Sequence, residues 1–143
     1  MSRVLHLRPH FVDLIPGQID DGVIYVSIKY RTAAHNCCCG CGQKVATPIS
    51  PTDWQIGFDG VDVSVTPSVG NWSFACQSHY WIKRGDVHWS YKFSPEEIRR
   101  ARDRDHRAAQ NAASEVTSRS EDERQEVRRR WPWTQRRSKR GDK

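Results

Sequence analysis

Residues 35–42 read His-Asn-Cys-Cys-Cys-Gly-Cys-Gly, and this stretch holds four of the five cysteines of the chain. The fifth, Cys76, begins the sequence Cys-Gln-Ser-His that ends at His79. Thiolates and an imidazole supplied by two separate segments are typical of a tetrahedral zinc site. We therefore expect a small fold in which one zinc ion joins a cysteine-rich loop to a later Cys-x-x-His segment.

The spacing of the cysteines restricts which of them can face one ion. In an extended segment alternate side chains point to the same side, which separates Cys38 from its neighbours. A set of four protein ligands leaves no coordination position vacant and predicts a structural role, whereas an open position would predict a catalytic one. The predicted ligands are Cys39, Cys41, Cys76 and His79, with Cys37 as the main substitute and His35 as a further alternative.

Apolar and charged residues are distributed unevenly along the 143 residues. Residues 94–143 contain fifteen Lys or Arg and ten Asp or Glu, with few residues that could form a core. Residues 1–93 contain nearly all the large apolar side chains, and so small a core often needs a metal or disulfides. We expect a zinc-binding β domain at 1–93, a basic helical extension at 94–131 and a disordered tail at 132–143.

The first 93 residues carry the patterns of antiparallel strands. Residues 23–30 are rich in β-branched and aromatic side chains and predict a strand that leads directly to the cysteine loop. Residues 54–65 contain Asp-Gly between two apolar runs, which predicts a hairpin with a tight primed turn. Residues 79–90 predict a second hairpin, with its turn at 83–86. The expected fold class is α+β, a small antiparallel β domain followed by a long C-terminal helix.

The helical pattern begins at Ser94. Ser94 and Glu97 form a capping box, and Pro95 suits the first helical turn, so a helix is predicted from 95 to about 117. A second capping signal at 120–123 predicts a short further helix to about residue 130.

The cysteines and the N-terminus bear on the compartment. The first residues contain no apolar segment of the kind found in signal peptides, and no stretch is long enough to span a bilayer. We expect the protein in the cytoplasm, where thiols stay reduced. Five cysteines also leave one over after any disulfide pairing, which favours metal ligation.

Hydrolytic chemistry has two candidate forms in this sequence. A metallopeptidase needs a general base beside an open zinc, yet residues 1–93 contain no glutamate and the chain has no His-Glu-x-x-His. If Cys37 replaces His79 as a ligand, the imidazole of His79 becomes available to activate Ser68. Asp53 is then the predicted carboxylate that orients the imidazole, with Asp86 as an alternative.

Several motifs together resemble a family of small bacterial proteins. They are the cysteine stretch 37–42, Trp54, the Thr-Pro-Ser-Val-Gly-Asn of 66–71, the Cys-Gln-Ser-His-Tyr-Trp-Ile of 76–82, and Val-His-Trp at 87–89. The family pattern is Cys-x-Cys-Gly-Cys-Gly, Pro-Ser-Val/Ile and Cys-x-Ser-His-Phe/Tyr, and the resemblance covers residues 20–92. Cys38 departs from the small residue or proline of that pattern.

Members of the family resemble accessory proteins encoded beside multi-ubiquitin-like proteins and their activating and conjugating enzymes. The resemblance implies a bacterial ubiquitin-like pathway, with a link to phage defence, and a peptidase that trims or removes the modifier. Two alternatives remain open. One is a zinc-stapled adaptor that binds the modifier or its enzymes without cleaving it. The other is a nucleic-acid binder that uses the Arg-rich tail with Trp131 and Trp133.

Overall fold

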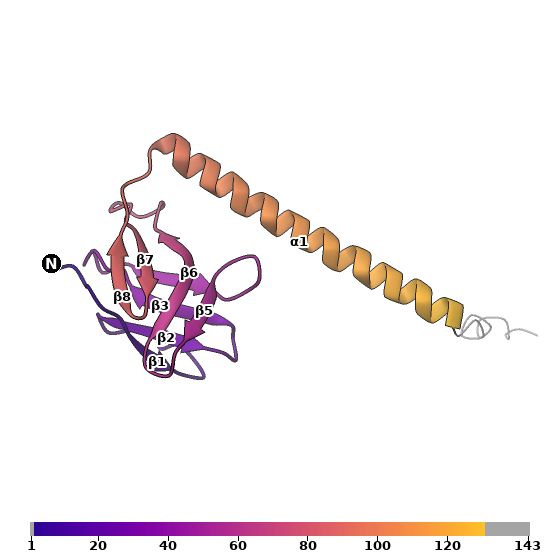
Figure 1. The fold of residues 1–143 in the computed structure, drawn as a ribbon, viewed down its shortest axis with the longest axis horizontal. Coiled ribbons are helices and arrows are strands. Elements are labelled where there is room, and N and C mark those ends of the chain that lie inside the picture. Colours follow the sequence, from indigo (N-terminus) through magenta and orange to yellow (C-terminus); the bar gives the residue numbers. More distant parts are fainter. Residues whose placement is uncertain (1, 131–143) are drawn as a thin grey trace, which may run out of the picture. The chain divides into compact units, whose positions relative to one another are not determined.

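The computed structural model describes residues 2–130. The chain divides into two compact units, the first ending at Asp103 and the second beginning at Arg104. Within residues 2–130 the chain forms eight strands followed by one helix, and their arrangement can be followed in Figure 1. In chain order they are β1 (Arg8–Phe11), β2 (Val23–Ser27), β3 (Thr32–Asn36), β4 (Lys44–Pro48), β5 (Gln55–Phe58), β6 (Val63–Gly70), β7 (His79–Lys83), β8 (Asp86–Trp89) and α1 (Pro95–Arg130).

The strands form two four-stranded sheets. The first has the order β1-β2-β3-β4 and the second the order β5-β6-β7-β8, so each sheet is built from strands consecutive in the sequence. All neighbouring strands pair antiparallel except β1 and β2, which pair in parallel. The predicted α+β class, with a small antiparallel β domain and a long C-terminal helix, is confirmed.

Both sheets contribute side chains to one hydrophobic core. The first sheet contributes Ile24, Val26 and Ala33, and the second contributes Val65 and Ile82 among others, all almost completely buried. Burial alternates along β4, as expected where one face of a strand is covered, whereas β2 is buried at consecutive residues from Ile24 to Ser27 and is therefore covered on both faces. This small core includes Cys37 and Cys38, so the cysteine loop is part of it.

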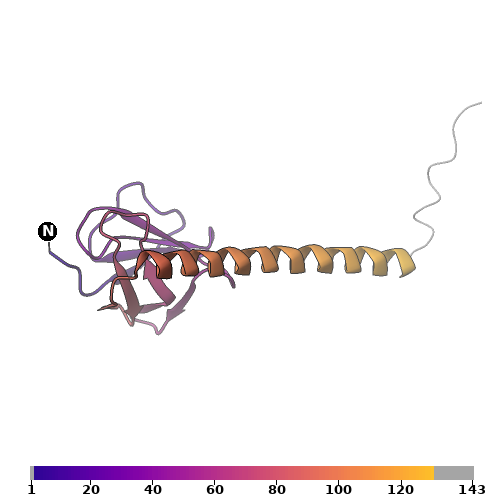
Figure 2. The same cartoon turned by 90° about the horizontal axis from the view of Figure 1, so that it is seen from above.

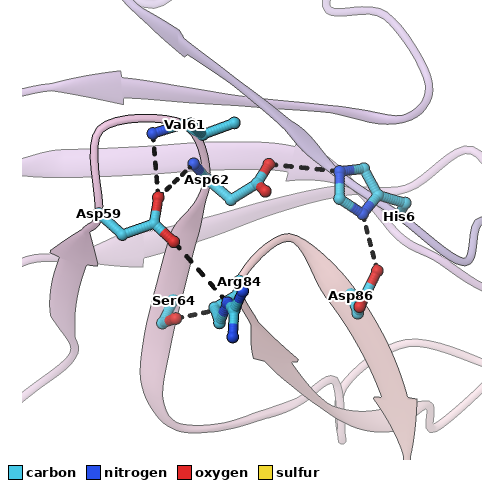
Figure 3. Close-up of polar contacts among 7 residues, drawn as sticks. All are labelled: His6, Asp59, Val61, Asp62, Ser64, Arg84 and Asp86. Atoms are coloured by element: carbon cyan, nitrogen blue, oxygen red, sulfur yellow. Dashed lines mark hydrogen bonds and ion pairs between the residues drawn. The ribbon is translucent and has the colours of Figure 1, made fainter.

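The N-terminal segment joins the first sheet to the hairpin turns of the second. His6 Nδ1 lies 2.8 Å from a carboxylate oxygen of Asp86, and His6 Nε2 lies 3.4 Å from one of Asp62 (Figure 3). The backbone N–H of Leu7 donates to the carbonyl of Gly85 at 2.8 Å. These contacts bring the segment before β1 alongside the turn between β7 and β8.

Both predicted hairpins are present, but one turn differs from the prediction. Asp59 and Gly60 do not form a two-residue turn, because Phe58 pairs with Val63 and leaves a four-residue loop. The Asp59 carboxylate accepts from the backbone N–H groups of Val61, at 2.9 Å, and Asp62, at 2.8 Å (Figure 3). Asp59 therefore supports the loop as an Asx-type turn, which satisfies backbone donors that a tighter turn would have paired across the strands.

The strands β3 and β4 were not predicted from the sequence. The strand predicted at residues 23–30 ends at Ser27, and β3 and β4 then flank the cysteine loop. β3 contains Thr-Ala-Ala-His-Asn, which has little of the β-branched or aromatic character that marks strands. Its pairing with β2 and β4 is set by tertiary contacts that a propensity argument does not include.

The helix is one continuous element from Pro95 to Arg130, instead of the two predicted (Figure 2). Ser120 lies inside this helix and does not cap a second one, and its hydroxyl donates to the carbonyl of Thr117 at 2.8 Å. Ile98 and Ala101, in the first turns, are buried. Within the described residues no helix combines the length and apolar character needed to cross a membrane. The predicted tail at 132–143, Trp131 and Trp133 lie outside the described residues.

We expect Gly85→Ala to destabilise the fold. Gly85 has φ of 78°, in the left-handed region, and an added Cβ would lie 3.0 Å from the carbonyl oxygen of Leu7 and closer to the His6 ring. The expected loss is about 1–3 kcal/mol in the free energy of unfolding, measured by urea denaturation. Gly17→Ala is the matched control, since nothing lies within 4 Å of its added Cβ. Equal stability of the two variants would contradict this view of the turn.

Candidate functional site

Four cysteine sulfurs converge from two segments of the first unit. Cys37, Cys39 and Cys41 lie in the loop between β3 and β4, and Cys76 lies in the loop between β6 and β7. Their Sγ atoms all lie within 4.8 Å of one another. Gly40 has φ of 86°, a backbone conformation that allows the loop to fold back on itself.

The separations between these sulfurs suit a tetrahedral metal ion. Cys37 Sγ lies 3.4 Å from Cys39 Sγ and 3.9 Å from Cys76 Sγ, and Cys41 Sγ lies 3.8 Å from Cys76 Sγ. A zinc–sulfur bond of roughly 2.3 Å implies tetrahedral edges of roughly 3.8 Å. The four side chains could therefore hold a metal ion. Cys38 lies outside this group and is fully buried in the core.

The thiols of the cluster have unequal acidity. Burial raises the pKa of the Cys37 thiol. Burial acts in the same direction on Cys76, but hydrogen bonds from the hydroxyl and backbone of Ser78 and from the Cys39 and Cys41 thiols lower its pKa to about 7. Four thiolates this close repel one another strongly, so full deprotonation of the cluster needs a cation.

His79 makes its polar contacts with Ser68 and Tyr91, outside the sulfur cluster. Its Nε2 lies 2.9 Å from Ser68 Oγ, and its Nδ1 lies 3.3 Å from the backbone carbonyl oxygen of Tyr91. Because a carbonyl can only accept, Nδ1 carries the proton and Nε2 is left to accept from the serine hydroxyl. This arrangement is that of a nucleophile beside a general base.

An irregularity in β6 presents Ser68 to the histidine. Val65 pairs with Ile82 and Val69 with Tyr80, so the three residues 66–68 lie opposite the single residue Trp81. Such a bulge re-aims side chains at a strand surface. His79 is the first residue of β7 and pairs with Gly70, which places its ring next to the bulge.

Aromatic rings surround the imidazole of His79, which is 6% exposed. Phe93 meets it edge-on with ring centroids 4.4 Å apart, and Trp72 lies 5.0 Å away at a tilt. Trp72 also stacks on Phe93 at 4.7 Å. A Cβ on Gly70 would come within 2.4 Å of the Trp72 indole, so only glycine leaves room for this ring. The histidine therefore works in a largely dry environment.

Asn71 links the cysteine cluster to the strand that carries Ser68. Its side-chain amide donates to Ser78 Oγ at 2.9 Å and to Cys37 Sγ at 3.6 Å. Its backbone N–H donates to the carbonyl of Ser78 at 2.9 Å, which closes the base of the loop between β6 and β7. Asn71 is 6% exposed, so these contacts are shielded from water.

The other residues predicted from the sequence lie elsewhere. Asp53 accepts from Ser50 Oγ at 2.6 Å, and the structure places the Tyr91 carbonyl, instead of a carboxylate, at His79 Nδ1. Asp86 lies with His6. His35 is buried and lies 2.8 Å from the Tyr80 hydroxyl, and burial lowers its pKa to about 4, so it is neutral near pH 7.

Sequence reasoning missed the Tyr91 carbonyl, Asn71 and the aromatic enclosure. A backbone carbonyl has no residue signature, so no pattern could have identified Tyr91. Asn71 ends the Thr-Pro-Ser-Val-Gly-Asn motif of 66–71, which gave it no role, and Trp72 follows it directly, so closeness to Ser68 in the sequence was a signal for both.

A cavity of about 300 Å³ lies beside this strand. The residues directly after Ser68, namely 69–71, line it together with Trp54 and Phe74. The Trp54 indole N–H donates to the backbone carbonyl of Ser68 at 3.3 Å, so the cavity wall and the backbone of Ser68 are connected. Ser68 itself is not among the lining residues, so the cavity adjoins its backbone and not its hydroxyl.

Metal content tests the ligand set. We expect Cys37→Ser, Cys39→Ser, Cys41→Ser and Cys76→Ser each to lose most of the bound metal, because a three-sulfur site binds far more weakly. Cys38→Ser and His79→Ala are the matched controls and should keep about one ion per chain by elemental analysis. Loss of metal in His79→Ala with retention in Cys37→Ser would restore the ligand set first predicted from the sequence.

Comparison with known protein families identifies one that this chain matches. The profile of a family described as "Bacterial ubiquitination-like system serine protease (BubE)" matches residues 11–90, more than half of the chain. No curated protein and no solved structure matches. The matched region contains the four clustered cysteines, Ser68 and His79. The chain thus belongs to the BubE family of bacterial ubiquitination-like system serine proteases.

Proposed function

We propose that this protein is a serine peptidase that cleaves bonds made by a ubiquitin-like modifier, with Ser68 as the nucleophile and His79 as the general base. The hydrogen bond of 2.9 Å between Ser68 Oγ and His79 Nε2 carries this proposal. The family description supports the class of reaction and the pathway. The substrates we propose are precursors or conjugates of the modifier, and the partners are the modifier and its activating and conjugating enzymes.

The proposed reaction proceeds through an acyl-enzyme. Ser68 Oγ attacks the scissile carbonyl carbon while its proton passes to His79 Nε2. The resulting imidazolium is stabilised by the hydrogen bond from Nδ1–H to the Tyr91 carbonyl. His79 then protonates the leaving amine, and afterwards activates the water that releases the acyl group from Ser68. A carbonyl dipole stabilises the imidazolium less than a carboxylate would. The low exposure of His79 strengthens the hydrogen bond to this carbonyl, because such bonds are electrostatically stronger away from water.

The metal we propose is zinc, held by Cys37, Cys39, Cys41 and Cys76. Thiolate donors at tetrahedral spacing favour zinc among the common divalent ions. Four protein ligands leave no coordination position for water, so the ion would supply stability to the fold. Holding Cys76 against the loop between β3 and β4 constrains the segment that joins β6 to β7, and these two strands carry Ser68 and His79.

Substitution of the dyad tests the proposed function. We expect Ser68→Ala and His79→Ala to lower the cleavage rate by at least about three orders of magnitude, since the nucleophile and its base act as one unit. The substrate is the modifier extended at its C-terminus, and cleavage is followed by intact mass. Ser118→Ala and His88→Ala are the matched controls, with both residues exposed, and they should cleave at the wild-type rate.

Asp53→Asn tests whether Asp53 or the Tyr91 carbonyl orients His79. Because Asp53 contacts Ser50, we expect this variant to keep activity within about twofold. Full activity of Ser68→Ala would overturn the proposal. A stable complex of the wild-type chain with the modifier, without any cleavage, would instead identify a non-catalytic adaptor.

A further inference from the structure

We propose that residues 90–94, which connect β8 to α1, position the catalytic histidine, and that the capping box at the start of α1 holds this linker in place. The inference rests on the proposed function of Ser68 and His79. It assigns positioning roles to the Tyr91 backbone, to Phe93, and to the pair Ser94 and Glu97.

The first part of the linker is fixed to the backbone of His79 itself. The N–H of Ser90 donates to the carbonyl of His79 at 2.9 Å. One residue later, the carbonyl of Tyr91 lies 3.3 Å from Nδ1 of the His79 ring. Backbone and side chain of the histidine thus both contact the same short segment, so a shift of the linker would change the tautomer or the tilt of the imidazole.

The second part of the linker packs on the ring. Phe93 lies 4.4 Å from the His79 ring, edge to face, and stacks on Trp72 at 4.7 Å. Trp72 in turn lies over Gly70, on the strand that carries Ser68. Phe93 therefore completes an enclosure that Trp72 alone would leave open on one side, and it excludes water from the base.

The far end of the linker is anchored by reciprocal hydrogen bonds at the helix N-terminus. Ser94 N–H donates to a Glu97 carboxylate oxygen at 2.7 Å, and Glu97 N–H donates to Ser94 Oγ at 3.3 Å. The Tyr91 hydroxyl also donates to Glu97, at 3.4 Å. Glu97 is thereby joined to both ends of the linker, so the cap fixes where α1 begins and where Tyr91 and Phe93 lie.

The family match covers only the first residue of this linker. It ends at residue 90, and Tyr91 and Phe93 are the next residues that contact His79. The matched region thus contains the proposed nucleophile, the proposed base and Ser90, while Tyr91 and Phe93, which contact the ring of the base, lie beyond it. The helix α1 therefore begins at the capping box that holds the linker against His79.

Labelling of Ser68 by a fluorophosphonate probe tests the inference without any knowledge of the natural substrate. We expect Phe93→Ala to lower the maximal labelling rate by about 10- to 100-fold and Ser94→Ala by about 3- to 10-fold. The probe concentration at half-maximal rate should stay within about twofold, because the linker contacts the base. Ser94→Asp, which restores a capping side chain, should recover the wild-type rate, and Ser118→Ala should retain it.

The possible outcomes separate the two proposals. Unchanged maximal rates in both Phe93→Ala and Ser94→Ala, with Ser68 labelled normally in the wild type, would overturn the role of the linker alone. A wild-type chain that is never labelled at Ser68 would overturn the proposed function and the linker role together. If Phe93→Ala fails to fold by circular dichroism, Ser94→Ala and its Ser94→Asp rescue decide the question, because Ser94 is exposed.

Discussion

The convergence of Cys76 with three sulfurs of the loop between β3 and β4 is the constraint on which the site depends. This contact joins the two sheets near the end of β6 and the start of β7, which carry Ser68 and His79. The loop that contains Cys76 is closed at its base by Asn71 and Ser78, and Asn71 also contacts a clustered sulfur. With the proposed metal in place of additional apolar residues, so small a core would hold the proposed dyad in register.

The Cys-Gln-Ser-His segment of residues 76–79 contributes to both the cysteine cluster and the proposed dyad. Cys76 and His79 are separated by two residues, the spacing expected for two ligands of one metal ion. In the structure they diverge, because Gln77 has φ of 45° and Ser78 is buried against Cys37, so that His79 begins β7 facing Ser68. The same short segment thereby serves the cysteine cluster at one end and the proposed chemistry at the other.

The strong local patterns of the sequence predicted much of the fold. Turn signals between apolar runs identified both hairpins, and the Ser94–Glu97 capping box identified the start of α1. The sequence did not reveal β3, whose small residues are held by neighbouring strands, nor the bulge before Val69, which is defined only by its pairing with β7. Ser68 and His79 were candidates from the sequence. Asp53 was predicted to orient His79, and only the structure identifies the Tyr91 carbonyl as the group beside His79 Nδ1.

The most direct test removes the metal from the reduced wild-type protein and follows Ser68 in the same sample. Bound metal is measured by elemental analysis as a chelator is titrated, and fluorophosphonate labelling of Ser68 is measured at each point. If the cysteine cluster holds the dyad in place, labelling falls in proportion to bound metal and returns when zinc is restored. A folded, metal-free protein that labels at the full rate would contradict the dependence of the dyad on the cluster.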